Sequence, residues 1–189
     1  TTLTGTTAGD TLTVNATALA DDIALTTAGA GNFTITGLKG DLTNTGSGTN
    51  TVTLKDNADG DYTISSSTTI SVANGTAQDG DTITLRGAGN KTVTGLVADV
   101  SLASTNTGTT AVTTGDASLA IASHASAGNL SVNATAAAEN KTLTLSGGAN
   151  AKSATLTGMN STLVATNLAS ALTIGLVDAT SNAISITTG

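Results

Sequence analysis

The sequence TISVANGTAQDGDTITLRGAGNKTVTGL occupies residues 69–96. It holds three short runs of β-favouring residues, ISV, ITL and TVT, separated by loops rich in Asn, Gly and Asp. Related sequences occur at residues 11–38 (TLTVNATALADDIALTTAGAGNFTITGL) and at residues 129–159. Because self-similarity at a fixed period is the signature of a repeat architecture, the pattern predicts a repeat protein.

Each copy continues through six short runs before the pattern restarts. Three leucines at equivalent places, Leu25, Leu85 and Leu145, lie 60 residues apart. We therefore expect a single elongated repeat domain over residues 1–189, belonging to a longer chain or assembly. Its super-repeats are predicted at approximately 11–68, 69–127 and 128–189. If the strands wind into stacked coils, the six strands of each unit would form either three coils of two strands or two coils of three strands.

The alternation within each run predicts which side chains are buried. In Thr82-Ile83-Thr84-Leu85 the apolar residues fall on one face of the strand and the threonines on the other. Aromatic residues make up only 1% of the chain, against 38% hydrophobic residues in total. The core must therefore be thin and built from Val, Leu, Ile, Ala and Thr methyl groups, and the chain is expected to be all-β.

Two all-β architectures satisfy this pattern. One is a parallel β-solenoid, in which each coil stacks on the next. The other is a row of tandem small β-sandwich domains. A sandwich of about 60 residues would have a marginal core, and the chain has no cysteine to reinforce it with disulfides. We therefore favour the β-solenoid. Its corners are predicted at the equivalent sequences GAGN (29–32 and 87–90) and GGAN (147–150), where Gly and Asn tolerate positive φ.

The charge pattern argues against several partners. The formal net charge is −7, and only six basic residues are present, scattered singly. Binding to nucleic acid or to an anionic membrane surface needs clustered Lys and Arg. No run approaches the roughly 20 apolar residues needed to span a bilayer. We therefore expect neither nucleic-acid binding nor membrane insertion.

Aspartates in two loops are the candidate metal ligands. Carboxylates beside Asn and backbone carbonyls are what calcium prefers, and the residues that provide them are Asp56, Asp59, Asp61, Asp79 and Asp81. Asp is also an ordinary turn residue, and the full EF-hand spacing is absent. Calcium is thus a possible cofactor, with these five aspartates as its ligands, and no other cofactor is expected.

Catalytic residues are not evident. His124 is the only histidine, with Ser123 and Ser126 beside it, but nothing nearby would orient the imidazole or hold an oxyanion. The single glutamate, Glu139, leaves no obvious carboxylate pair for glycoside chemistry. We expect that the chain is not an enzyme, and a carbohydrate-active β-helix enzyme is kept only as a remote alternative.

Repeated Thr-x-Thr pairs suggest a binding module instead. Ice-binding β-solenoids carry stacked threonines in a flat array, although here the intervals between pairs are irregular. A regular, exposed ladder on one face would argue against a purely structural role. The pairs are Thr11/Thr13, Thr34/Thr36, Thr51/Thr53, Thr82/Thr84, Thr92/Thr94, Thr142/Thr144 and Thr155/Thr157.

The recurring TLTV, TITL and TVTGL units, the AGAGN and GGAN corners, and the lack of Cys, Pro and Trp together support a resemblance. The chain resembles the Thr/Ser/Ala/Gly-rich β-strand-repeat regions of bacterial S-layer proteins and large secreted surface adhesins. This resemblance implies an extracellular location at the cell surface, self-assembly, frequent calcium dependence and no catalysis. The expected function is a structural component of a surface layer, fibre or adhesin stalk. The expected partners are further copies or neighbouring repeats, and a surface glycan if the chain acts as an adhesive module.

Overall fold

The computed structural model describes residues 1–189 except 22, 125–126, 148–152, 169–170, 178–184 and 189. The described residues form strands, turns and loops, with no helix. The strands are β1 (Thr2–Gly5), β2 (Thr11–Asn15), β3 (Leu25–Gly29), β4 (Asn32–Leu38), β5 (Leu42–Asn44), β6 (Asn50–Leu54), β7 (Asp61–Ser66), β8 (Ile70–Ala73), β9 (Thr82–Arg86), β10 (Lys91–Leu96), β11 (Asp99–Leu102), β12 (Thr110–Thr114), β13 (Leu119–Ser123), β14 (Leu130–Asn133), β15 (Thr142–Gly147), β16 (Ala154–Met159), β17 (Thr162–Thr166), β18 (Leu172–Leu176) and β19 (Ile186–Thr188).

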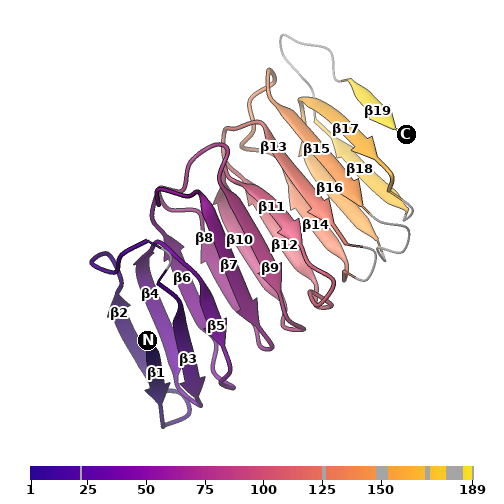
Figure 1. Ribbon diagram of the computed structural model, residues 1–189. Coiled ribbons are helices and arrows are strands. Elements are labelled where there is room, and N and C mark those ends of the chain that lie inside the picture. The colour runs from indigo at the N-terminus through magenta and orange to yellow at the C-terminus, as the bar shows by residue number, and fades with distance from the viewer. Residues whose placement is uncertain (22, 125–126, 148–152, 169–170, 178–184, 189) are drawn as a thin grey trace.

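The strands form two parallel sheets. The ten odd-numbered strands make one sheet and the nine even-numbered strands make the other, each in chain order. Figure 1 shows the two sheets lying against each other along the length of the molecule. Each coil therefore consists of one odd strand and the next even strand. The predicted β-solenoid is confirmed, and the sandwich alternative is excluded because every strand pairs in parallel with strands two places away.

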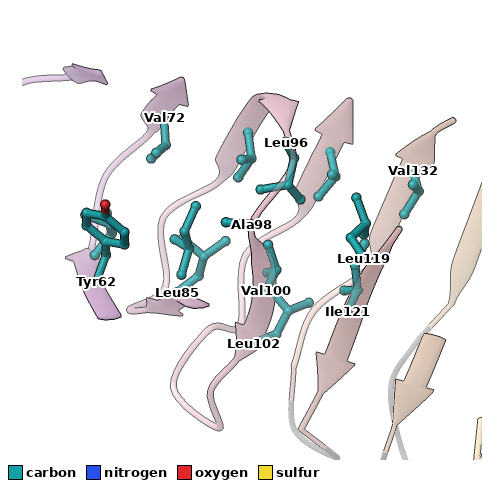
Figure 2. Packing of buried hydrophobic residues seen from close by; sticks show 14 of the residues in the cluster. Tyr62, Val72, Leu85, Leu96, Ala98, Val100, Leu102, Leu119, Ile121 and Val132 are labelled. Carbon is teal, nitrogen blue, oxygen red and sulfur yellow. The ribbon is translucent and has the colours of Figure 1, made fainter. Parts of the chain in front are cut away.

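The core between the sheets is built from stacked aliphatic side chains. On the even sheet one inward position forms a ladder through all nine strands: Val14, Ile35, Val52, Val72, Val93, Val112, Val132, Leu156 and Ile174. The facing ladder on the odd sheet includes Tyr62, Ile83, Val100, Ile121 and Leu145. Figure 2 shows side chains of both ladders filling the space between the sheets. Similar residues thus repeat at one strand spacing, about 4.8 Å.

A recurrent bulge explains the Thr-x-Thr-Gly-Leu/Met sequence. Gly37, Gly95 and Gly158 have φ of 71°, 65° and 70°, and the pairing register shifts at each of these places. A glycine with positive φ inserts one extra residue in the strand. The following Leu or Met therefore points inward again and is fully buried.

Corners of the coils lie at glycines with positive φ, as the GAGN sequences predict. Gly29 and Gly87 have φ of 87° and 84°, which confirms the expected conformation at two of the three GAGN or GGAN sequences. A Cβ on Gly29 would lie 2.2 Å from the carbonyl oxygen of Gly5 in the preceding coil. Glycine is therefore required there by both conformation and space. The third corner, at 147–150, lies largely outside the described residues.

Two details differ from the sequence prediction. The first detail concerns the three leucines predicted to be equivalent. Leu25 stacks on Leu42, Leu42 on Ile64 and Ile64 on Leu85, so Leu25 and Leu85 share one ladder. Leu145, however, stacks through β13 and β11 on Ile83. The third leucine is thus displaced by two residues, a shift that alternation tolerates because it keeps the side chain on the same face. The second detail is the run Ile23-Ala24-Leu25, which the repeat makes equivalent to Ile83-Thr84-Leu85 and so predicts as a strand; β3 begins only at Leu25, and Ile23 is exposed.

The six strands of each predicted 60-residue unit correspond to three coils of two strands. Coil length varies, and the loops absorb the variation. The step from Leu25 to Leu42 is 17 residues, whereas the step from Leu42 to Ile64 is 22. Since parallel strands all point the same way, the loops fall on two opposite edges. Loops from odd to even strands form the glycine edge, and loops from even to odd strands form the acidic edge.

Candidate functional site

Acidic side chains gather on one edge of the solenoid. Of the 13 acidic residues, Asp22 and Asp178 lie outside the described residues. All but one of the others lie in a loop of the acidic edge or at the first residue of the strand that follows it. The exception is Asp10, on the glycine edge. The residues on the acidic edge are Asp21, Asp41, Asp56, Asp59, Asp61, Asp79, Asp81, Asp99, Asp116 and Glu139.

The five predicted calcium ligands lie in two adjacent loops of this edge. Asp56 and Asp59 lie in the loop between β6 and β7, and Asp61 is the first residue of β7. Asp79 and Asp81 lie in the loop between β8 and β9, one coil further on. The two loops touch, because the amide of Thr82 donates a 2.7 Å hydrogen bond to the carbonyl of Gly60. Stacking thus brings the two aspartate groups onto neighbouring coils.

The side chain of Asp81 closes its own loop. It is 8% exposed, and its Oδ2 accepts a 2.6 Å hydrogen bond from the amide of Gln78. Asn57 closes the preceding loop in the same way, because its Oδ1 accepts a 2.6 Å hydrogen bond from the amide of Gly60. These are the turn functions that Asp and Asn commonly perform. Among the described residues, no group of three or more His, Cys, Asp or Glu side chains lies close enough to hold a metal ion.

Tyr62 is a core residue whose hydroxyl lies near several of these carboxylates. Its ring is buried, and its hydroxyl donates to the carbonyl of Lys55 at 2.8 Å. Burial, together with the negative charges of Asp81, Asp56 and Asp21, raises the pKa of the Tyr62 hydroxyl well above its usual range. Asp21 is held by an ion pair with Lys39, at 3.3 Å, in the next coil. The nearby carboxylates and burial thus favour the neutral, hydrogen-bonded form of Tyr62.

The glycine edge contains a buried polar stack that the sequence analysis did not single out. Asn44 donates through Nδ2 to the hydroxyls of Ser66 (3.1 Å) and Thr68 (2.7 Å), and its Oδ1 accepts from Thr27 at 3.1 Å. Asn50 donates to the same Thr27 hydroxyl at 2.8 Å. The alternation of the strands could have revealed this stack, because Thr27, Asn44, Asn50 and Ser66 occupy inward positions of their strands.

Lys91 extends this polar stack into the next coil. It is 1% exposed, and its Nζ donates to the carbonyl oxygens of Gly87 (2.8 Å), Gly89 (2.5 Å) and Ser66 (3.3 Å). Desolvation lowers the pKa of Lys91 to about 8. Its inward position was visible in the sequence, because Lys91 lies two residues before the core residue Val93. A lysine so enclosed serves the fold and is not accessible to a partner.

Ser123 is the last residue of β13, and His124 follows it directly. The amide of His124 donates to the carbonyl of Leu102 at 2.9 Å. The hydroxyl of Ser123 donates to the backbone carbonyl of His124, at 3.5 Å. Ser126 lies outside the described residues.

The Thr-x-Thr pairs divide between the two sheets. Four pairs lie in register on the even sheet, on β4, β6, β10 and β16. The pair Thr11/Thr13 is also on the even sheet but is displaced, since Thr13 stacks on Thr34 while Thr11 stacks on Asn32. The pairs on β9 and β15 belong to the odd sheet. Stacking therefore places these four pairs in two common columns, but β8, β12 and β14 between them carry Ser, Ala or Asn at one or both positions.

Comparison with protein families, with curated proteins and with solved structures gives no match for this chain. Within the described residues, no helix is long and apolar enough to cross a membrane. The function must therefore be argued from the geometry.

Proposed function

We propose that this chain is a structural segment of a bacterial extracellular surface layer, fibre or adhesin stalk. It acts by stacking β-coils, either with further coils of the same protein or with those of another copy. The observation that carries the proposal is the uninterrupted parallel pairing of both sheets from the first strand to the last. The extracellular location rests on the resemblance to surface-protein repeats.

The distribution of exposed apolar side chains supports stacking at the ends. The exposed large hydrophobic residues are Leu12, Ile23, Leu176, Val177 and Ile186. The first two belong to the first coils and the other three to the last. Leu12, Leu176 and Ile186 pair with Phe33, Met159 and Leu163 of the adjacent coils, which are buried. Each terminal coil thus presents the apolar positions and the unpaired strand edge that an interior coil uses to bind its neighbour.

The ladder geometry also supports a spacer role. Ten strands at about 4.8 Å give the odd sheet a length of roughly 43 Å along the stacking direction. Each added coil of about 20 residues therefore extends the rod by about one strand spacing. Length is set by coil number, and strand pairing in both sheets continues although the loops differ in length.

Electron microscopy of the purified chain, with and without calcium, tests self-association. We expect end-to-end assemblies of the unmodified chain at high protein concentration. The substitution Leu176→Lys should shorten them, because it places a charge on the apolar end. Thr113→Lys, in the middle of the even sheet, is the matched control and should leave assembly unchanged. Isolated monomers in both conditions would contradict self-assembly, and assembly only with calcium would indicate that ions at the acidic edge take part.

A further inference from the structure

The outward face of the even sheet carries two continuous columns of small uncharged side chains, which we call the threonine face. Its residues flank the inward aliphatic ladder on each strand. The column before the ladder residue is Thr13, Thr34, Thr51, Ser71, Thr92, Ala111, Ser131, Thr155 and Thr173; the column after it is Asn15, Thr36, Thr53, Ala73, Thr94, Thr113, Asn133, Thr157 and Gly175. All these positions are exposed or half-exposed.

The spacing of the threonine face is fixed by the backbone. Within a column the repeat is the strand spacing of about 4.8 Å, and between columns it is two residues along a strand, about 6.6 Å. The residues between the columns are the core ladder, of which Val52, Val72 and Val93 are at most 1% exposed. On each strand, the residue between the two columns thus packs into the core and fixes the positions of its two outward neighbours. The face is a rigid two-dimensional array.

The threonine face differs from the opposite face in its charge. None of its side chains is charged. On the odd sheet the equivalent outward positions include Asp61, Asp99 and Arg86. Apart from Asp10 and the inward Lys91, the charged side chains of the described residues thus lie on the acidic edge and the odd sheet. The two columns present hydroxyl and methyl groups, together with the amides of Asn15 and Asn133.

Most hydroxyls of the threonine face are available to bind water. Thr36 and Thr157 donate to the carbonyl oxygens of Val14 and Val132, each at 3.4 Å. The other hydroxyls of the two columns make no hydrogen bond to the described residues. Each threonine therefore offers a donor and acceptor beside an exposed methyl group.

The chemistry of this face excludes several kinds of ligand. Nucleic acid needs cations, and a metal ion needs carboxylates; the face has neither. Specific protein partners bind chiefly through aromatic and Arg anchors in desolvated pockets, which a surface of small side chains does not provide. The ligand that remains is uncharged, hydrogen-bonded and periodic in two dimensions.

We propose that the threonine face binds ice. Rows of methyl groups and hydroxyls at fixed spacing order the water above them, and this ordered layer joins the surface of an ice crystal. The large number of equivalent weak contacts provides the affinity, so no single residue needs to act as an anchor. This inference is independent of the structural role, because a rod that stacks through its ends still exposes this face along its length.

Ice growth in the presence of the purified chain tests the proposal. We expect thermal hysteresis and shaped crystals from the unmodified protein. Thr92→Tyr, in the centre of the face, should abolish both, because the ring lifts the protein from the ice. Thr84→Tyr makes the same change on the odd sheet and should leave both unchanged. Tyr has high β-propensity, and circular dichroism and thermal unfolding establish that both variants are folded.

Three results would overturn the proposal. The first is an unmodified chain without any effect on ice growth. The second is equal loss of activity in Thr92→Tyr and Thr84→Tyr, which would separate the activity from this face. The third is reversible dimerisation in sedimentation that only Thr92→Tyr abolishes, without an effect on ice, which would assign the face to a second copy of the chain.

Discussion

The Nζ of Lys91 lies 2.8 Å from the carbonyl oxygen of Gly87, inside the corner that Gly87 turns. The ammonium is neutralised by no carboxylate among the described residues and is surrounded by backbone carbonyls of two successive coils. It ties the Ser66 end of β7 to the corner that follows β9. Because the ammonium is buried away from water, the pKa of Lys91 is lowered. The stability of the fold should therefore depend on pH in the range where Lys91 titrates.

We predict that stability rises with pH between about 8 and 10. The pKa of Lys91 is about 8 in the folded chain against 10.5 for an ordinary lysine. The unfolded state therefore binds more protons in this range, and raising the pH favours folding. Urea unfolding at several pH values measures the effect. Lys91→Met should remove the rise, whereas an unchanged pH profile in that variant would contradict the assignment.

Tyr62 predicts the opposite trend at higher pH. Its pKa lies above the ordinary value of 10.0 because of burial and the nearby carboxylates. Above about pH 10 the unfolded chain loses the phenolic proton first, so stability should fall as pH rises further. Tyr62→Phe removes the titrating group and keeps the ring, and should therefore flatten the fall. Retention of the full fall in this variant would show that another group causes it.

Two glycines with similar backbone conformations are expected to differ in tolerance. Gly75 and Gly95 have φ of 60° and 65°. A Cβ on Gly95 would meet nothing within 4 Å, whereas one on Gly75 would lie 1.8 Å from the carbonyl oxygen of Leu54. Gly95→Ala should cost about 1–2 kcal/mol through conformational strain alone. Gly75→Ala should cost clearly more, and equal urea midpoints would refute the predicted clash.

The aliphatic ladder should dominate stability. Ile83 is 0% exposed and stacks on Tyr62 and Val100. Ile83→Ala should destabilise the chain by about 2–5 kcal/mol, since it leaves a cavity between three coils. Thr84→Ala, on the outward face of the same strand, should change stability by no more than about 0.5 kcal/mol. A similar loss in both variants, measured by urea unfolding, would contradict the two-sheet core.

The sequence predicted the fold because local alternation and turn chemistry agree with the tertiary structure. Ile83 and Leu85 were expected in the core and Thr82 and Thr84 outside, and each lies on the predicted face. The β-solenoid follows once such strands repeat with glycine corners. Strand number per coil could not be derived, because it depends on which non-adjacent strands pair.

The candidate surfaces were less accessible to sequence reasoning. The Thr-x-Thr intervals are irregular because the loops of successive coils differ in length, so only the stacking register places Thr53 and Thr94 in one column. The aspartates were recognised as a loop feature, but their common edge depends on loop direction, which follows from the topology. Lys91 was overlooked because a single lysine in a polar chain is usually exposed.

We propose that the coils stack through their ends, and a tandem fusion of two copies tests this. Solution X-ray scattering would compare the fusion with the single chain. If terminal coils stack across the junction, the fusion should scatter as one rigid rod of about twice the length, and its melting temperature should exceed that of the single chain, because an end has become an interior interface. Two independently moving bodies with an unchanged melting temperature would contradict the claim.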